Sequence, residues 1–350
     1  MVGEEFLPRT VGNIRRDPVT FVIGTASGDH IIVTQPSSLL TMSQPHHSRA
    51  ALSRRNFLSL SATAAVATLA SSGAATSARA AEGSPAAKPK KKIPIGIELY
   101  AVRGELTKDL PGTLKTLSKM GYEAVEFYSP YFAWKFPFAK EVRTMIDDLG
   151  LRCYSTHNGV ASVTPGETMD RAIELNQILG SRMIVVASTP RGTTGVEGWK
   201  KTCDLFTAAT EKLVPHGLTA GFHNHKTEWA TLQGDQRIMD FMAANTPKEF
   251  VLQFDVGTAM EAGIDPVAWI KANPGRIRSI HVKDWAPGKK EEEKAYRVLF
   301  TEGVTPWKDI FAAAESGGGV EFYLMEQEGS RYSEFETAER CLATWKKMRG

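Results

Sequence analysis

The sequence predicts a single-domain α/β protein, a (β/α)8 barrel of the TIM type, and three observations lead to this fold class. Eight short runs rich in β-branched and aromatic residues alternate with amphipathic helical stretches over about 260 residues. Polar side chains follow the runs, as expected at the barrel face that carries active sites. The alternative is a doubly wound sheet, which needs a glycine-rich phosphate turn after its first strand, where this chain reads Y-A-V-R-G-E-L.

The eight predicted strands leave room for a helix after each one. They span residues 95–100, 123–128, 152–157, 183–188, 218–225, 250–256, 277–284 and 321–328. Two of the predicted helices cover 110–121 and 139–150, and a last helix covers 333–348. We expect helices to end at four glycines, because glycine adopts the left-handed conformation of helix C-termini. These are Gly121, Gly150, Gly180 and Gly217.

The N-terminal region has the pattern of an export signal. The stretch S-R-R-N-F-L contains Arg54 and Arg55, an apolar run follows to about residue 75, and A-R-A ends at Ala80. This combination predicts a twin-arginine signal peptide over residues 42–80, with the translocation machinery as a partner and a periplasmic or otherwise exported location. A membrane anchor is the alternative, but the run is too short and too rich in Ala, Ser and Thr for stable insertion.

The segments on either side of this signal carry no predicted fold. Residues 1–41 show no clear periodicity, and we expect them to be untranslated or disordered, with Met42 as the true start. Residues 81–92 have the composition of a flexible linker. The predicted catalytic domain is therefore the stretch 93–350, long enough for one large domain.

Composition narrows the function classes. The net charge of +3 implies no strongly basic surface, so charge does not suggest a nucleic-acid partner. The three cysteines are widely spaced, which predicts small buried residues rather than a disulfide framework or a cysteine zinc site. They are Cys153, Cys203 and Cys341.

Polar residues at the predicted strand ends point to a site at the barrel mouth. His157, His223, His225 and His281 all lie there, and alternation along a strand puts His223 and His225 on one face. The other polar residues at or near these ends include Glu98, Tyr100, Arg103, Glu126, Tyr128, Gln253, Asp255, Lys283, Asp284, Glu326 and Glu328.

Several motifs resemble the sugar phosphate isomerase/epimerase family, a barrel superfamily related to xylose isomerase and endonuclease IV. The most specific are F-D-V-G-T-A-M-E-A-G-I-D-P and G-R-I-R-S-I-H-V-K-D. I-G-I-E-L-Y-A-V-R, G-Y-E-A-V-E-F-Y, L-F-T-E-G-V-T-P-W and Y-L-M-E-Q-E are also similar, and the resemblance covers residues 93–348.

The resemblance implies one divalent metal held by four side chains. Asp255, His281 and Glu326 match three of the ligand positions. Many relatives have Glu-Asn-His in the fifth strand, where this chain has His-Asn-His, so His223 would replace a carboxylate. Two carboxylates and two imidazoles suit Mn, Zn, Co, Fe or Ni ions better than Mg, which prefers oxygen ligands.

The expected catalytic residues are Glu126, His157, Lys283 and Glu326. Glu126 is a candidate general base or substrate ligand, with a structural pair to Arg103 as the alternative. His157 is a candidate acid or base, or a ligand of a sugar hydroxyl. Lys283 would stabilise an enolate or bind a hydroxyl, unless it only forms a salt bridge with Glu326 or Glu328.

Aromatic residues near the strand ends suggest sugar binding, because aromatic rings suit the C–H faces of sugars. The expected substrate-binding residues are Tyr100, His225, Tyr128, Trp134 and Trp229. The alternatives are an aromatic cap without a ligand role, and for His225 a hydrogen-bonded residue that orients its neighbours.

Together these features predict a metal-dependent isomerase or epimerase that acts on a keto-sugar or keto-glycoside through an enediolate. The same site would also serve a sugar lyase or dehydratase. A non-catalytic sugar-binding barrel is a further alternative. An endonuclease-like function is disfavoured, because spare metal ligands and basic stripes are lacking. The sequence is compatible with an oligomer but does not determine the number of subunits.

Overall fold

The computed structural model describes residues 20–24, 30–34, 92–288 and 296–349. The chain divides into two compact units, residues 1–90 and 91–350. In the first unit, β1 (Thr20–Gly24) and β2 (His30–Thr34) form an antiparallel pair, which the sequence did not indicate. The predicted signal peptide lies outside the described residues, as does all of the predicted linker except Lys92, so both stay predictions.

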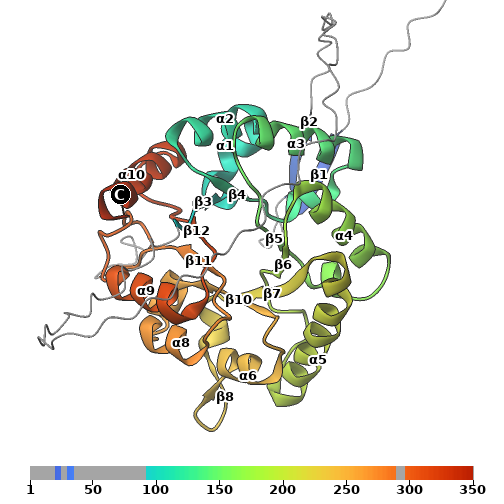
Figure 1. The fold of residues 1–350 in the computed structure, drawn as a ribbon, viewed down its shortest axis with the longest axis vertical. Coiled ribbons are helices and arrows are strands. Elements are labelled where there is room, and N and C mark those ends of the chain that lie inside the picture. Colours follow the sequence, from blue (N-terminus) through green and yellow to red (C-terminus); the bar gives the residue numbers. More distant parts are fainter. Residues whose placement is uncertain (1–19, 25–29, 35–91, 289–295, 350) are drawn as a thin grey trace, which may run out of the picture. The chain divides into compact units, whose positions relative to one another are not determined.

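The second unit is built on a nearly closed barrel of eight parallel strands in the order β4-β3-β12-β11-β10-β7-β6-β5 (Figure 1). Two isolated parallel bridges, Ala124 with Arg152 and Phe127 with Thr156, join the ends of the sheet. The predicted fold class is therefore confirmed. The strands are β3 (Ile95–Glu98), β4 (Ala124–Glu126), β5 (Ser155–Asn158), β6 (Met183–Val186), β7 (Thr219–His223), β10 (Val251–Asp255), β11 (Ser279–Val282) and β12 (Phe322–Met325).

Helices surround the strands (Figure 1). They are α1 (Arg103–Lys108), α2 (Leu110–Met120), α3 (Phe136–Asp148), α4 (Glu167–Leu179), α5 (Gly195–Leu213), α6 (Ile238–Asn245), α7 (Val256–Glu261), α8 (Pro266–Ala272), α9 (Trp307–Ala313) and α10 (Glu334–Arg349). The predicted stop at Gly121 is confirmed, because this residue caps α2 with φ of 101°. No helix in the described ranges is long and apolar enough to cross a bilayer.

Short turns and one hairpin complete the second unit. They are η1 (Leu99–Val102), η2 (Ser129–Ala133), η3 (Val160–Val163), η4 (Val214–His216), η5 (Lys226–Trp229), η6 (Ala314–Gly318), and the strands β8 (Thr231–Gln233) and β9 (Gln236–Arg237). The turn η1 begins directly after β3, and η2, η3 and η5 begin within three residues of the ends of β4, β5 and β7. The observed strands are therefore shorter than the predicted ones.

A layer of apolar side chains, here called the apolar floor, fills the barrel interior on the N-terminal side of the polar strand ends. Met183, Val185, Val251, Phe322 and Leu324 form one buried cluster there. Backbones approach so closely that a Cβ on Gly96 would lie 2.8 Å from the Ala124 carbonyl oxygen and 2.9 Å from Leu324 Cδ2.

On β3, β10 and β12 the next inward-facing positions, two residues further along each strand, carry polar side chains. Glu98 follows Gly96, Gln253 follows Val251, and Glu326 follows Leu324. The polar layer thus stands directly on the apolar floor. The strand residues that face the helices, such as Phe127 and Phe254, are buried in the main hydrophobic core.

Candidate active site

The C-terminal ends of the barrel strands bring buried polar side chains together, because parallel strands all end at the same face. Seven of the eight strand ends contribute. The side chains are Glu98, Glu126, His157, His223, Gln253, Asp255, His281, Lys283 and Glu326, and each residue is at most 8% exposed. Every residue that the sequence predicted as catalytic or metal-binding is in this cluster.

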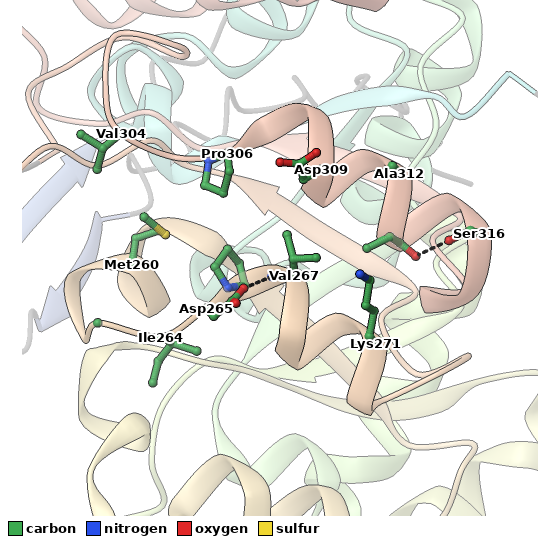
Figure 2. Close-up of a pocket in the computed structure, with 13 residues that line it drawn as sticks. Met260, Ile264, Asp265, Val267, Lys271, Val304, Pro306, Asp309, Ala312 and Ser316 are labelled. Atoms are coloured by element: carbon green, nitrogen blue, oxygen red, sulfur yellow. Dashed lines mark hydrogen bonds between the residues drawn. The ribbon is translucent and has the colours of Figure 1, made fainter.

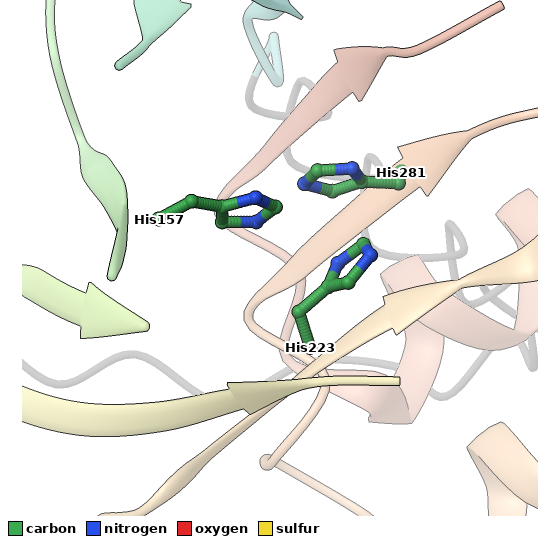
Figure 3. Close-up of side chains that lie close together, drawn as sticks. All are labelled: His157, His223 and His281. Atoms are coloured by element: carbon green, nitrogen blue, oxygen red, sulfur yellow. The ribbon is translucent and has the colours of Figure 1, made fainter. Parts of the chain in front are cut away.

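Three imidazole rings converge at the centre of the cluster (Figure 3). The ring centroids of His157 and His223 are 4.6 Å apart, and those of His223 and His281 are 4.5 Å apart. His157 and His281 stack almost in parallel at 5.1 Å. One ring nitrogen of each lies within 4.8 Å of the others, close enough to share a ligand.

His281 lies between two carboxylates. Its Nδ1 atom is 2.7 Å from Glu326 Oε2, and its Nε2 atom is 2.9 Å from Glu126 Oε2, although the latter contact is not aligned as a hydrogen bond. Burial disfavours a charged ring, but Glu126 and Glu326 outweigh it and raise the pKa of His281 to about 10. The hydrogen bond to Glu326 orients the ring between the two carboxylates.

His223, Asp255 and Glu326 form a set of metal-type ligands within 4.8 Å of one another. The His223 Nε2 atom is 3.8 Å from Asp255 Oδ2. Oδ1 of Asp255 accepts a hydrogen bond from the Thr258 backbone, whereas the buried Oδ2 accepts none within the described part of the chain. Burial lowers the pKa of His223 well below its ordinary value, so its ring is neutral.

This donor set suits a divalent cation. It offers two carboxylates and a neutral imidazole, and the buried Asp255 Oδ2 accepts no hydrogen bond from the described residues, so a cation would compensate its burial. His281 extends the set through its contact with Glu326. The structure thus brings the four predicted ligands together, and their binding of a metal stays a prediction.

Lys283 occupies the space between the same carboxylates. Its Nζ atom lies 3.6 Å from both Asp255 Oδ2 and Glu326 Oε1, and 2.8 Å from Glu328 Oε1. The expected alternative, a salt bridge with Glu326 or Glu328, is therefore present with both. Although burial favours the neutral acid, the charges of Lys283 and His281 hold the pKa of Glu326 below its ordinary value.

Gln253 connects the remaining members of the cluster. Its Nε2 atom donates to Glu126 Oε1 at 2.9 Å, and its Oε1 atom is 2.6 Å from His157 Nε2 and 3.1 Å from His223 Nδ1. The predicted alternative pair of Glu126 with Arg103 is not formed in the described residues, because Arg103 instead contacts Glu328 at 3.3 Å. The catalytic roles of Glu126 and His157 stay predictions.

Three of the five expected substrate-binding residues surround the mouth. Tyr100 is 40% exposed. Its ring lies perpendicular to that of Tyr128, with 5.4 Å between the ring centroids. His225 is exposed, and its ring centroid is 4.9 Å from that of His223. It follows β7 rather than belonging to it, and its backbone N–H donates to Glu228 Oε2.

The structure does not bring Trp134 and Trp229 to the mouth. Trp134 packs against Phe127, at 5.1 Å between ring centroids. Trp229 is 5% exposed and packs against Trp269 at 5.1 Å. Trp229 is therefore part of the main hydrophobic core, and Trp134 is partly buried and packs against it.

Sequence reasoning gave no role to Asp284, which organises a loop beside the site. Its Oδ2 atom accepts hydrogen bonds from the Thr301 and Gly303 backbone at 2.8 and 3.2 Å, and from Trp307 Nε1 at 3.0 Å. A Cβ on Gly303 would lie 2.1 Å from Asp284 Oδ1. The signal that could have found this anchor is a carboxylate two residues after the apolar strand β11 and followed by Trp285.

A separate hollow of about 820 Å³ lies between the turn after α7, helix α8 and helix α9 (Figure 2). Met260, Val267, Lys271 and Asp309 are among its lining residues. None of the lining residues belongs to the cluster at the strand ends. This hollow is therefore distinct from the candidate active site.

Residues 114–344 match the family described as Xylose isomerase-like TIM barrel, and the chain belongs to this family. The chain is 24% identical to a solved sugar phosphate isomerase/epimerase from Parabacteroides distasonis ATCC 8503, with a TM-score of 0.59 over 74% of this chain and 94% of that one. It is 15% identical to the IOLI protein, solved with a zinc atom, with a TM-score of 0.55 over 73% of this chain and 96% of that one.

A curated relative is the inosose dehydratase of Mesomycoplasma hyopneumoniae (strain 7448), 38% identical over 91 residues. The match covers 25% of this chain and only 29% of that relative. Family and relatives together support an enzyme.

Proposed function

We propose that the protein is a metal-dependent isomerase or epimerase that acts on a keto-sugar or keto-glycoside. The observation that carries this proposal is the convergence of His223, Asp255 and Glu326 beside Lys283 and His281 at the barrel mouth. Metal donors, a carboxylate and a cation within a few ångströms suit proton abstraction next to a carbonyl.

His223, Asp255, His281 and Glu326 would hold the ion. When bound, a divalent cation supplies Lewis-acid stabilisation of negative charge on the carbonyl and an adjacent hydroxyl oxygen. The mixed nitrogen and oxygen donors favour Mn, Zn, Co, Fe or Ni ions over Mg.

The chain's own residues then perform the proton transfer. The Oε2 atom of Glu326 is held by His281, which leaves Oε1 to accept the α-proton. A pKa below the ordinary value keeps Glu326 ionised at neutral pH. Lys283 lies 3.6 Å from Glu326 Oε1 and would donate hydrogen bonds to the substrate oxygen that gains negative charge. Tyr100, Tyr128 and His225 at the rim would contact the rest of the sugar.

Proton exchange tests this function directly. The full chain, loaded with Mn²⁺, is incubated in heavy water with a panel of keto-sugars and keto-glycosides, and loss of the α-proton is followed by NMR. We expect exchange that EDTA abolishes, and loss of both metal and exchange in Asp255→Asn.

Asp265→Asn is the matched control for that variant. Asp255 caps helix α7 by accepting from the Thr258 backbone, and Asp265 caps helix α8 by accepting from the Val267 and Ala268 backbone, but Asp265 lies outside the cluster. It should keep full exchange. Wild-type protein that binds no metal, or exchange that survives EDTA, would contradict the proposal.

A dehydratase is the second candidate, because the matching segment of inosose dehydratase favours it. The same abstraction followed by loss of a β-substituent gives an unsaturated ketone instead of a stereoisomer or positional isomer. Product analysis by mass separates the two, since only dehydration or glycoside loss changes the mass. Ligand binding without any turnover across the panel would instead indicate a sugar-binding barrel.

We also propose export by the twin-arginine machinery, which the S-R-R-N-F-L motif, the apolar run and the A-R-A site support. Replacing Arg54 and Arg55 by lysine should retain the precursor in the cytoplasm. Secretion that is unchanged in this double variant would refute the signal.

A further inference from the structure

Tyr296 lies in the loop after β11, and neither the sequence motifs nor the proposed mechanism gives it a role. Its ring lies over Lys283, with 5.2 Å between the ring centroid and Nζ. A cation at this distance is attracted by the negative charge above an aromatic face. Tyr296 is half-buried and Lys283 is only 5% exposed, so the ring is part of what covers the ammonium group.

Both ends of Tyr296 are held in place. Its hydroxyl donates to Glu261 Oε2 at the end of α7, and Lys226 Nζ donates to the other oxygen of that carboxylate at 3.0 Å. Burial alone would raise the pKa of Glu261, but these two hydrogen bonds lower it, so the carboxylate is ionised and accepts from both. The backbone oxygen of Tyr296 accepts from Gln327 Nε2 at 2.6 Å. The residue is thus fixed between α7 and the chain that follows β12.

Helix α7 also holds the aliphatic stem of Lys283. A Cβ on Gly257 would lie 2.8 Å from the Lys283 backbone oxygen and 2.9 Å from its Cγ, so the stem packs directly against this glycine. Gly257 and Glu261 are four residues apart and therefore share one face of α7. The same helix face thus locates the stem of Lys283 and, through Glu261, the ring that covers its Nζ.

The other contacts of Lys283 Nζ are with carboxylate oxygens. It donates to Glu328 at 2.8 Å, and oxygens of two predicted metal ligands, Asp255 and Glu326, are each 3.6 Å away. We propose that Tyr296 is a positioning residue: its ring excludes water from the Lys283 ammonium and keeps Nζ beside these ligands, where it would meet the substrate oxygen. The inference rests on the role of Lys283 in the proposed function.

The ring should affect the rate more than the affinity for substrate. Loss of the ring leaves the carboxylate contacts of Lys283 in place, but it lets water reach the ammonium. An ammonium in contact with water stabilises a developing negative charge less well than one in a dry site, because water screens the interaction. The contribution of a cation–π contact in such a site corresponds to about a factor of ten in rate.

NMR of the metal-free full chain tests the position of the ring without any substrate. Lysine labelled with ¹³C at Cε is incorporated, and the Lys283 signal is identified by its absence in Lys283→Arg. Protons above an aromatic face are shifted upfield, so the Lys283 Cε protons should be upfield in the wild type and in Tyr296→Phe. They should return to the ordinary lysine position in Tyr296→Leu. Tyr332→Leu is the matched control, because the Tyr332 ring contacts Arg331 and Arg340 instead, and it should leave the signal in place.

Proton exchange in the presence of Mn²⁺ tests the effect of the ring on catalysis. Tyr296→Leu should lower kcat about tenfold and change KM by less than about twofold. Tyr296→Phe should recover most of the lost rate, because it keeps the ring and loses only the hydrogen bond to Glu261.

Two results would overturn the proposal. One is a Lys283 signal that does not move in Tyr296→Leu, and the other is an equal loss of kcat in the leucine and phenylalanine variants, which would assign the effect to the hydroxyl. If Tyr296→Leu fails to fold, an ordinary lysine shift in the wild type overturns it equally. A wild type that exchanges no sugar refutes the proposed function instead, and the NMR signal still decides whether the ring holds Lys283.

Discussion

Replacing Lys283 by methionine should destabilise the metal-free protein strongly. The Nζ atom of Lys283 lies 2.8–3.6 Å from oxygens of Asp255, Glu326 and Glu328, and its side chain is 6% exposed. Methionine keeps much of the apolar length and removes only the charge. The variant therefore leaves buried carboxylates without their cation.

The expected loss is about 3–5 kcal/mol of unfolding free energy, the cost of removing one partner from a buried ion pair. For a domain of this size each kcal/mol lowers Tm by roughly 2–4 °C, so Tm should fall by about 6–20 °C. A divalent ion bound by Asp255 and Glu326 would replace the ammonium charge. Mn²⁺ should therefore stabilise Lys283→Met more than it stabilises the wild type.

Calorimetry in EDTA and in excess Mn²⁺ measures both effects. Lys92→Met is the control, because Lys92 contacts Glu123 at 2.5 Å but its side chain is 81% exposed. An exposed pair contributes about 0–1 kcal/mol, so this variant should melt close to the wild type. Equal Tm values for Lys283→Met and wild type in EDTA would refute the reasoning, as would equal stabilisation by Mn²⁺.

Three further predictions concern residues away from the proposed ligands. Burial raises the pKa of all three thiols, so thiol reagents should label the native protein only after urea is added, and rapid native labelling would contradict the buried positions of Cys153, Cys203 and Cys341. Burial raises the pKa of Tyr131 to about 12, so the native state keeps a proton that the unfolded state loses above about pH 10. Tyr131 should therefore contribute about 2–3 kcal/mol to the fall in stability between pH 10 and 12 in urea titrations, and an equally steep fall in Tyr131→Phe would contradict this cause. Asp284→Asn should cost about 2–4 kcal/mol by removing charged hydrogen bonds and should speed amide exchange in the loop that it anchors, whereas unchanged exchange would argue against the anchor.

The barrel and most of its polar mouth could be predicted from the sequence because strand alternation is a local property. Asp255, His281 and Glu326 each end an apolar run, and parallel strands carry such residues to one face. The role of Gln253 could not be predicted in the same way. Which atoms its amide faces depends on four other strands, and no sequence pattern encodes that geometry.

The positions of two aromatic residues could not be predicted from the sequence. Trp134 and Trp229 follow strand ends in sequence, which suggested the mouth, but each sits on a turn that leaves the barrel axis. The direction that the chain takes after a strand depends on what its large side chains pack against. Here Trp134 packs against Phe127, and Trp229 packs against Trp269. Burial of indole surface outweighs proximity in sequence.

Strand β7 ends at His223, so the structure holds His223 more tightly than His225. His223 is fixed by the barrel wall and by Gln253, whereas His225 is held through its backbone and presents an exposed ring. Substitutions at residue 225 should therefore alter which sugar is accepted while leaving fold and ion content intact. A mutant library at residue 225 should therefore change substrate range at little cost in stability.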